Sequence, residues 1–135
     1  MNVVDILRRD EGLRLKPYQC TAGKLTIGYG RNLEDRGITR EEAEYLLRND
    51  IAEVERDAHK FPWYAGLDEA RKAVVLSMLF NLGPSRFRGF ANTIKDIAAG
   101  DYVSASRRLL QSLWARQVGA RAVRLAQMMR TGEWV

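Results

Sequence analysis

The chain has 135 residues, enough for one domain with a buried core and too few for a second independent domain. Lys and Arg residues exceed Asp and Glu by 22 to 17, and the net charge of +5 favours a polyanionic partner without choosing among nucleic acid, anionic lipid and acidic cell-wall polymer. The single cysteine excludes an internal disulfide. Because the chain contains only one cysteine and one histidine, we expect no metal site.

The N-terminal segment also bears on where the protein works. Residues 1–16 lack the continuous apolar stretch of a signal peptide, and no apolar run approaches the length of a membrane span. We therefore expect synthesis in the cytoplasm and no stable membrane insertion. Any work outside the cytoplasm would need a release route supplied by something else.

Apolar residues at helical spacing predict a first helix, with Asn2 as its N-cap. Gly12 stands where a left-handed residue ends such a helix, which places Glu11 in the last turn. The period then changes between Lys16 and Leu33 to the alternation of a hairpin or small sheet, with a turn over residues 21–24. If the loop is Ala22 to Lys24, Cys20 and Thr26 face each other across the strands and point the same way.

Helices dominate the rest of the chain. We expect a turn over residues 35–37, and then Thr39 and Glu42 form a capping box at the start of a long helix that ends before Pro62. Asp68 caps a helix over residues 68–83 that is apolar nearly all round, the pattern of a buried helix. Three shorter helices follow at about residues 90–99, 102–112 and 120–131, separated by glycines.

This order of elements predicts an α+β fold. A small β-hairpin lobe, about residues 13–60, is joined by the long helix to a larger helical lobe formed by residues 1–12 and 61–135. We expect both lobes to belong to a single domain, residues 1–135, with an active-site cleft between them.

Three residues near the hairpin carry the chemistry of a candidate site. Glycoside hydrolysis needs an acid that protonates the leaving oxygen and a second group that handles water or the developing positive charge. Glu11 suits the first role, although an isolated Glu of this kind is usually a surface residue. Cys20 is either a small buried residue or a group exposed to the cleft. Its polar neighbours in the sequence favour the second alternative. Thr26 either holds the water through its hydroxyl or simply favours a strand.

The spacing of Glu11, Cys20 and Thr26 resembles the Glu, Asp-or-Cys, Thr signature of the phage-type lysozymes, the bacteriophage endolysins that cut peptidoglycan. The resemblance runs nearly end to end. It includes the stretch from Met1 to Lys16 as the first helix and its exit, and the sheet from Lys24 to Gly30. Further segments follow in family order: Phe80-Asn81-Leu82-Gly83, Gly89-Phe90, Ser112-Leu113-Trp114 and Arg130-Thr131-Gly132-Glu133-Trp134.

The resemblance implies a lysozyme-like fold, Glu11 as general acid, Cys20 at a position more often occupied by aspartate, and Thr26 as third member. It also implies saccharide contacts at four residues: Asn32, Phe80, Thr93 and Arg108. Of these, Arg108 replaces a residue that is polar and uncharged in the family. Arg121 matches a cation that faces the catalytic Glu in the family, and Arg31 stands where some members have His.

We therefore expect a muramidase that hydrolyses the β-1,4 bond between N-acetylmuramic acid and N-acetylglucosamine, acting as a monomer on peptidoglycan glycan strands without a cofactor. The family implies water attack with inversion. It also implies an enzyme that is made in the host cytoplasm and acts on the cell wall after release by a separate membrane-permeabilising factor. A lytic transglycosylase would cut the same bond without consuming water, and a non-catalytic cell-wall-binding module would keep the cleft without the chemistry. A nucleic-acid-binding domain is favoured only by the charge and the C-terminal arginines, so we expect no nucleic-acid partner.

Overall fold

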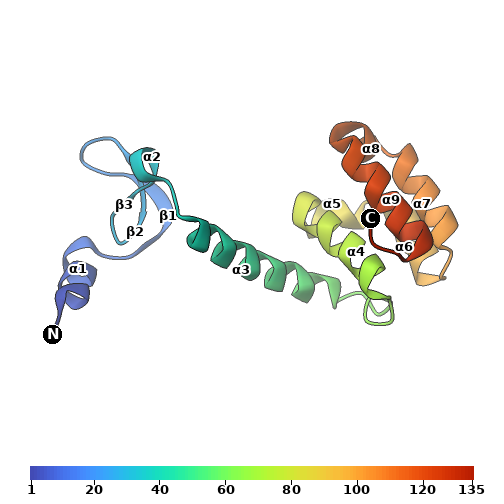
Figure 1. Cartoon of the computed structure of the whole chain (residues 1–135), viewed down its shortest axis with the longest axis horizontal. Coiled ribbons are helices and arrows are strands. Elements are labelled where there is room, and N and C mark those ends of the chain that lie inside the picture. The colour runs from blue at the N-terminus through green and yellow to red at the C-terminus, as the bar shows by residue number, and fades with distance from the viewer. The chain divides into compact units, whose positions relative to one another are not determined.

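The computed structural model describes residues 1–135, and the chain divides into two compact units, Met1–Leu46 and Leu47–Val135. The first unit contains α1, three strands and the short α2, whereas the second is helical (Figure 1). Helix α3 (Arg40–Ala58) begins in the first unit and ends in the second. The predicted α+β class is confirmed.

Helix α1 (Val3–Glu11) has the predicted boundaries. Asn2 and Asp5 form a capping box, because each side chain accepts the backbone N–H of the other at 3.1 Å. Gly12 ends the helix at φ 70°, and its amide donates to the Arg8 carbonyl at 3.1 Å. These two local signals place Glu11 in the last turn, as predicted.

The sheet consists of β1 (Arg14–Gln19), β2 (Leu25–Gly28) and β3 (Arg31–Asn32) in antiparallel order. The turn between β1 and β2 differs from the prediction. The Cys20 amide donates to the Lys24 carbonyl at 2.9 Å, and the Gly23 amide donates to the Cys20 carbonyl at 2.8 Å. The loop is therefore residues 21–23, one residue earlier than expected, because Gly23 at φ 77° takes the left-handed position of a three-residue hairpin loop.

This loop changes the strand register. Thr26 pairs with Tyr18, whereas Cys20 lies opposite Lys24, so the expected direct pairing of Cys20 with Thr26 is wrong. The shift moves the register by two positions in all, which leaves Cys20 and Thr26 as diagonal neighbours on the same face of the sheet. The expectation that both side chains point the same way therefore holds.

The segment after β3 also differs from the prediction. Residues expected as a turn belong to a short helix, α2 (Leu33–Arg36), which Asn32 caps and Gly37 ends. Helix α3 begins as predicted, since the Thr39 amide donates to Glu42 at 2.8 Å and the Glu42 amide donates to the Thr39 hydroxyl at 3.1 Å.

The second unit contains α4 (Glu69–Leu82), α5 (Pro84–Arg88), α6 (Ala91–Ala98), α7 (Tyr102–Gln111), α8 (Leu113–Val118) and α9 (Ala120–Thr131). Asp68 caps α4 as predicted, and the three shorter helices correspond to α6, α7 and α9. The sequence analysis missed α5 and α8, which are too short to establish a helical period of apolar residues.

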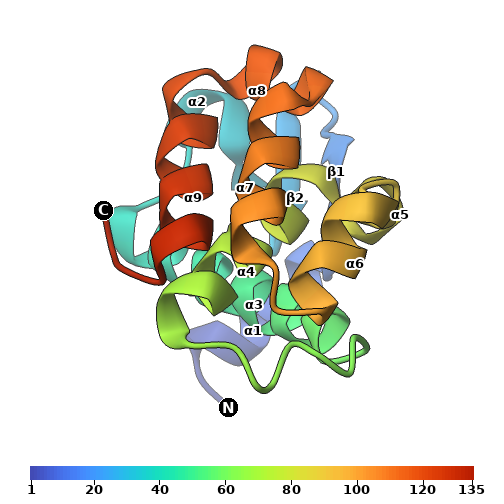
Figure 2. The ribbon, with the colours of Figure 1, turned by 90° about the vertical axis from the view of Figure 1, so that its right-hand side faces the viewer.

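The apolar core lies in the second unit. Helices α7 and α9 lie side by side (Figures 1 and 2), and α4 supplies five buried residues. Polar bonds fix the helices to one another: the Ser106 hydroxyl donates to the Ala126 carbonyl at 2.8 Å, and the Trp114 ring N–H donates to the Asn81 side chain at 2.9 Å. The largest fully buried side chains are Phe87, Met78, Leu79, Leu109, Met129, Val74 and Val75.

Helix α1 groups with the strands in the first unit, and none of its residues is buried. The assignment of residues 1–12 to the helical lobe stays a prediction. None of the helices combines the length and the apolar character needed to cross a bilayer.

Candidate active site

Glu11 lies directly against the loop between β2 and β3. A Cβ atom added to Gly30 would stand 2.8 Å from Glu11 Oε2 and 3.2 Å from Glu11 Cδ, so the carboxyl group occupies the space that any side chain at residue 30 would need. Gly30 also has φ 78°, a conformation that favours glycine. Glycine at residue 30 therefore does two things. It allows the tight loop, and it leaves open the space in which the Glu11 carboxylate lies, which we call the Gly30 seat.

Cys20 lies at the end of β1, where the turn directs backbone amides toward its thiol. Hydrogen bonding from the Lys24 amide, then the Ala22 amide, lowers the pKa of Cys20 below its ordinary value, against a smaller opposing effect of desolvation. The Thr26 hydroxyl contributes to the same lowering of the pKa. The environment of Cys20 thus favours the negatively charged thiolate. The same hydrogen bonds would favour the carboxylate of an aspartate at this position.

Thr26 lies in the central strand and is only 3% exposed, the one buried residue of the first unit. Its hydroxyl donates to the Lys24 carbonyl at 2.8 Å. A hydroxyl has one proton, so donation to this carbonyl and donation to an ionised Cys20 are alternatives. In either state, the lone pairs of the oxygen remain free to accept a hydrogen bond from water.

Asn32 pairs with Thr26 across the sheet, so both residues lie on the face that carries Cys20. Its side chain is already engaged as the cap of α2. The Asn32 oxygen accepts the Asp35 amide at 3.0 Å, and its nitrogen donates to the Asp35 carboxylate at 3.0 Å. A saccharide contact by Asn32 would have to share these groups with α2.

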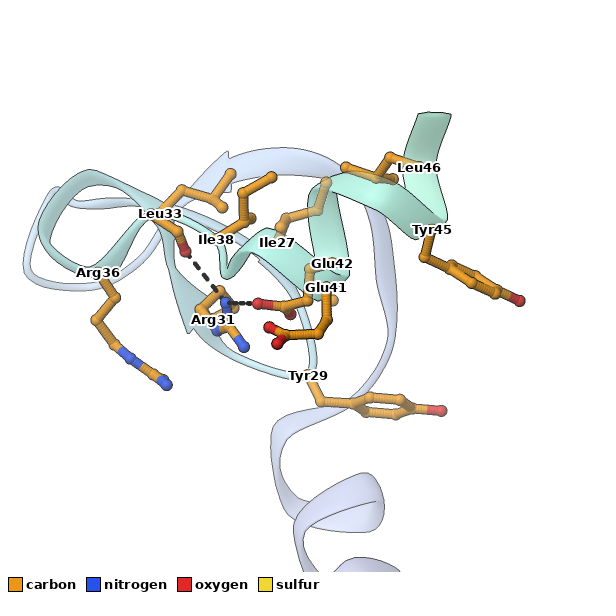
Figure 3. A pocket seen from close by; sticks show the side chains of 12 residues that line it. Ile27, Tyr29, Arg31, Leu33, Arg36, Ile38, Glu41, Glu42, Tyr45 and Leu46 are labelled. Atoms are coloured by element: carbon orange, nitrogen blue, oxygen red, sulfur yellow. Dashed lines mark hydrogen bonds and ion pairs between the residues drawn. The ribbon is translucent and has the colours of Figure 1, made fainter. Parts of the chain in front are cut away.

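An apolar pocket of about 1010 Å³ opens elsewhere in the first unit (Figure 3). Arg31 lines this pocket and donates to the Glu42 carboxylate at 2.8 Å and to the Gly37 carbonyl at 3.1 Å. The bond from Arg31 and the Thr39 amide lower the pKa of Glu42 to about 2. None of Glu11, Cys20 and Thr26 lines this pocket, whose apolar wall is formed by Ile27, Leu33, Ile38 and Leu46.

The predicted contacts in the second unit fall in two places. Thr93 and Arg108 line one pocket of about 310 Å³, whereas the half-exposed Phe80 lines a different one. Arg121 donates to both the hydroxyl and the carbonyl of Ser77, at 2.9 and 3.3 Å. No group of three or more His, Cys, Asp or Glu side chains is placed to hold a metal ion.

Two features of the site were missed by the sequence analysis. The seat at Gly30 depends on a contact between residues far apart in the chain, for which two glycines flanking Tyr29 were the only signal. The Arg31–Glu42 pair was missed because Glu42 was interpreted only as part of a capping box.

The sequence profile of the phage lysozyme family matches residues 8–130 of the chain. The chain is 37% identical over 123 residues to an endolysin of Acyrthosiphon pisum secondary endosymbiont phage 1, covering 86% of this chain and 80% of that protein. It is 31% identical over 123 residues to an endolysin of Salmonella phage P22, with coverage of 85% and 82%.

A third relative is much longer. The pre-baseplate central spike protein Gp5 of Enterobacteria phage T4 is 29% identical over 161 residues, which cover 98% of this chain and only 28% of the spike protein. Since the family profile matches most of the chain, the protein belongs to the phage lysozyme family.

Proposed function

We propose that the protein is an endolysin-type muramidase that hydrolyses the β-1,4 bond between N-acetylmuramic acid and N-acetylglucosamine in bacterial peptidoglycan. Membership of the phage lysozyme family and similarity to two phage endolysins support this activity. The observation that carries the assignment of the acid is the seat of Glu11 on Gly30, which holds one carboxyl group against the loop of the sheet that bears Cys20 and Thr26.

In the proposed reaction, Glu11 protonates the glycosidic oxygen as the bond to the sugar carbon breaks, and water supplies the new hydroxyl. Cys20 as thiolate accepts a proton from that water, and Thr26 orients it by accepting a hydrogen bond. Saccharide contacts are proposed for Asn32, Phe80, Thr93 and Arg108.

Replacement of the proposed acid tests the assignment. Glu11→Gln keeps the size of the side chain but cannot donate the proton, so lysis of purified cell walls should fall by about 10²- to 10⁴-fold. The matched control is Asp10→Asn, which removes the neighbouring exposed carboxylate that pairs with Arg9 and should leave lysis unchanged. Turbidity loss by Glu11→Gln at the wild-type rate would refute the role of Glu11.

Fragment masses separate the muramidase from its rivals. A hydrolase adds one water to each cleaved bond, whereas a lytic transglycosylase leaves an anhydro end that is lighter by one water. If every fragment lacks this water, the reaction is transglycosylation and the muramidase proposal is refuted. Wall binding without any fragments would indicate a non-catalytic module.

The proposed role of Cys20 has a pH signature. Because the thiol pKa is lowered yet the thiol is a weaker acid than a carboxyl, Cys20→Asp should remain active and extend lysis to lower pH. Wild-type activity should rise as pH increases through the Cys20 pKa, since the thiolate forms over that range. Cys20→Ser and Cys20→Ala cannot ionise and should lose at least about 10-fold in rate. Equal rates for Ala, Ser and wild type would make Cys20 a packing residue.

A further inference from the structure

A pocket of about 300 Å³ lies in the second unit, lined by residues of α3 and α4, of the segment between them and of the C-terminal segment. We call it the Trp134 pocket, after the residue near the C-terminus that contributes an aromatic ring to its lining. None of the proposed catalytic residues and none of the four proposed saccharide contacts lines it. The Trp134 pocket is therefore separate from the sites described above.

One face of α4 provides a wall of mixed character. The lining residues of this helix stand three, four and seven positions after the first of them, the spacing of a single helix face: Glu69, Lys72, Ala73 and Leu76. The Lys72 ammonium lies 3.7 Å from the Glu69 carboxylate and 5.7 Å from the centre of the Tyr64 ring. The α4 wall therefore offers a donor, an acceptor and two apolar side chains.

Other polar groups of the lining have no partner within the protein. The Glu55 carboxylate, the His59 ring nitrogens and the Tyr64 hydroxyl make no hydrogen bond and no ion pair. Tyr64 is only 3% exposed, and every fully buried polar side-chain atom of the protein has a partner, so the small accessible part of Tyr64 includes its hydroxyl. Since Tyr64 lines the pocket, a ligand there can reach this hydroxyl.

The charges around the Trp134 pocket nearly cancel. Burial raises the pKa of Tyr64 above its ordinary value, and the negative charges of Glu55 and Glu69 raise it further, so the hydroxyl keeps its proton at neutral pH. Lys72 is the one Lys or Arg residue of the lining and offsets one of the two carboxylates. A cationic ligand would meet Lys72, and an anionic ligand would meet both carboxylates. A neutral ligand that donates and accepts hydrogen bonds meets neither obstacle.

Trp134 adds a flat apolar surface to these polar groups. The residue is 67% exposed, although it lines the pocket. An exposed indole ring is a suitable surface for the C–H face of a sugar ring, because both surfaces are flat and apolar. The hydroxyl groups of such a sugar point outward from the ring edge, where they can bond to surrounding polar side chains.

We propose that the Trp134 pocket is an accessory saccharide-binding site that holds one N-acetylated sugar of a glycan strand. The sugar packs on the Trp134 indole, its hydroxyl groups donate to the Glu55 and Glu69 carboxylates, and the Tyr64 hydroxyl donates to the N-acetyl carbonyl. The proposal rests on the peptidoglycan substrate of the proposed function, whose strands repeat such sugars. A second contact with the same polymer raises the effective concentration of glycan at the enzyme.

Direct binding to the full chain tests this site without depending on hydrolysis. The probe is tetra-N-acetylchitotetraose, which contains no muramic acid and therefore lacks the bond to be cleaved. The indole N–H resonance of Trp134, identified by its absence in Trp134→Phe, should shift and saturate with this ligand. Maltotetraose has no N-acetyl group and should bind at least about 10-fold more weakly, because it leaves the Tyr64 hydroxyl without an acceptor.

Variants then connect binding to the named groups, with the Ala73 amide as the reporter resonance. Trp134→Ala and Glu55→Ala should each weaken binding of chitotetraose at this site by about 10-fold or more. Both side chains are exposed and lie outside the core, so these variants keep the fold. Glu133→Ala is the matched control, because it removes an exposed carboxylate beside Trp134 that does not line the pocket.

Four outcomes would overturn the site. They are a Trp134 resonance that chitotetraose leaves in place, equal binding of chitotetraose and maltotetraose, tighter binding of Nα-acetyl-lysine than of either sugar, and equal effects of Glu55→Ala and Glu133→Ala. Lysis of cell walls is measured in parallel on the same wild-type preparation. An unmoved Trp134 resonance with intact lysis rejects only the accessory site, whereas binding at Trp134 without lysis rejects only the muramidase.

Discussion

At the scale of single residues, the contact between Glu11 and Gly30 does most to define the site. The helix end determines where the carboxyl group starts, and a missing side chain on the opposite loop determines where it can rest. Gly28, the last residue of β2, also has positive φ, but a Cβ atom there would meet nothing within 4 Å. A comparison of substitutions at Gly28 and Gly30 therefore separates the effect of backbone strain from the effect of contact with Glu11.

Gly30→Ala should displace Glu11 and reduce lysis by about 100-fold, because misplacing a catalytic group by an ångström has effects of that size. Gly28→Ala imposes similar backbone strain, about 1 kcal/mol, and should lower stability while keeping the lysis rate. Lysis rates and thermal unfolding of both variants check the prediction. If the two variants lyse walls equally well, the seat at Gly30 has no part in catalysis.

At the scale of elements, Arg71 joins three helices of the second unit. It donates to the carbonyls of Met129 and Arg130 at 2.7 and 3.0 Å, which lie at the end of α9. Its guanidinium also lies over the Tyr102 ring at 3.7 Å, at the start of α7. These bonds satisfy carbonyls that the end of a helix otherwise leaves without a partner.

Arg71→Lys keeps the charge but cannot reach both carbonyls and the ring at once, so we expect a loss of about 2–3 kcal/mol in unfolding free energy. The Arg71 side chain is 14% exposed, so solvent replaces these bonds poorly. Arg130→Lys is the control, because it keeps the Arg130 carbonyl and should change stability by less than about 0.5 kcal/mol. Denaturant unfolding curves that coincide for the two variants would contradict this role of Arg71.

At the scale of the whole molecule, burial is distributed unequally between the two units. Every buried apolar residue lies between Ala58 and Met129, and the first unit buries only Thr26. Stability against local opening follows buried apolar contacts, so the second unit holds most of it.

Native-state hydrogen exchange should therefore be slowest in α4, α7 and α9 and faster throughout residues 1–46. The measurement resolves individual amides, and those of α4 serve as the internal reference. Uniform protection across both units would show that the first unit is stabilised by more than its own contacts.

Local signals in the sequence were sufficient wherever a cap or a glycine decides the structure. Asn2, Thr39 with Glu42, and Asp68 begin their helices as predicted, because a cap acts within three residues of itself. The same logic could have placed the first hairpin loop correctly, since Gly23 suits the left-handed position that ends a three-residue loop. The family resemblance was also readable from the sequence, because it depends on residue types in order.

By itself, therefore, the sequence determined the α+β class, the main helices, the family and the residue types available for catalysis. Tertiary structure decided which of these residues meet: Glu11 on Gly30, Cys20 diagonal to Thr26, and Trp134 in one pocket with Glu55 and Tyr64. The physical reason is that caps and turns depend on atoms a few residues apart. Contacts between distant segments depend on strand register and helix packing, which the local pattern does not specify.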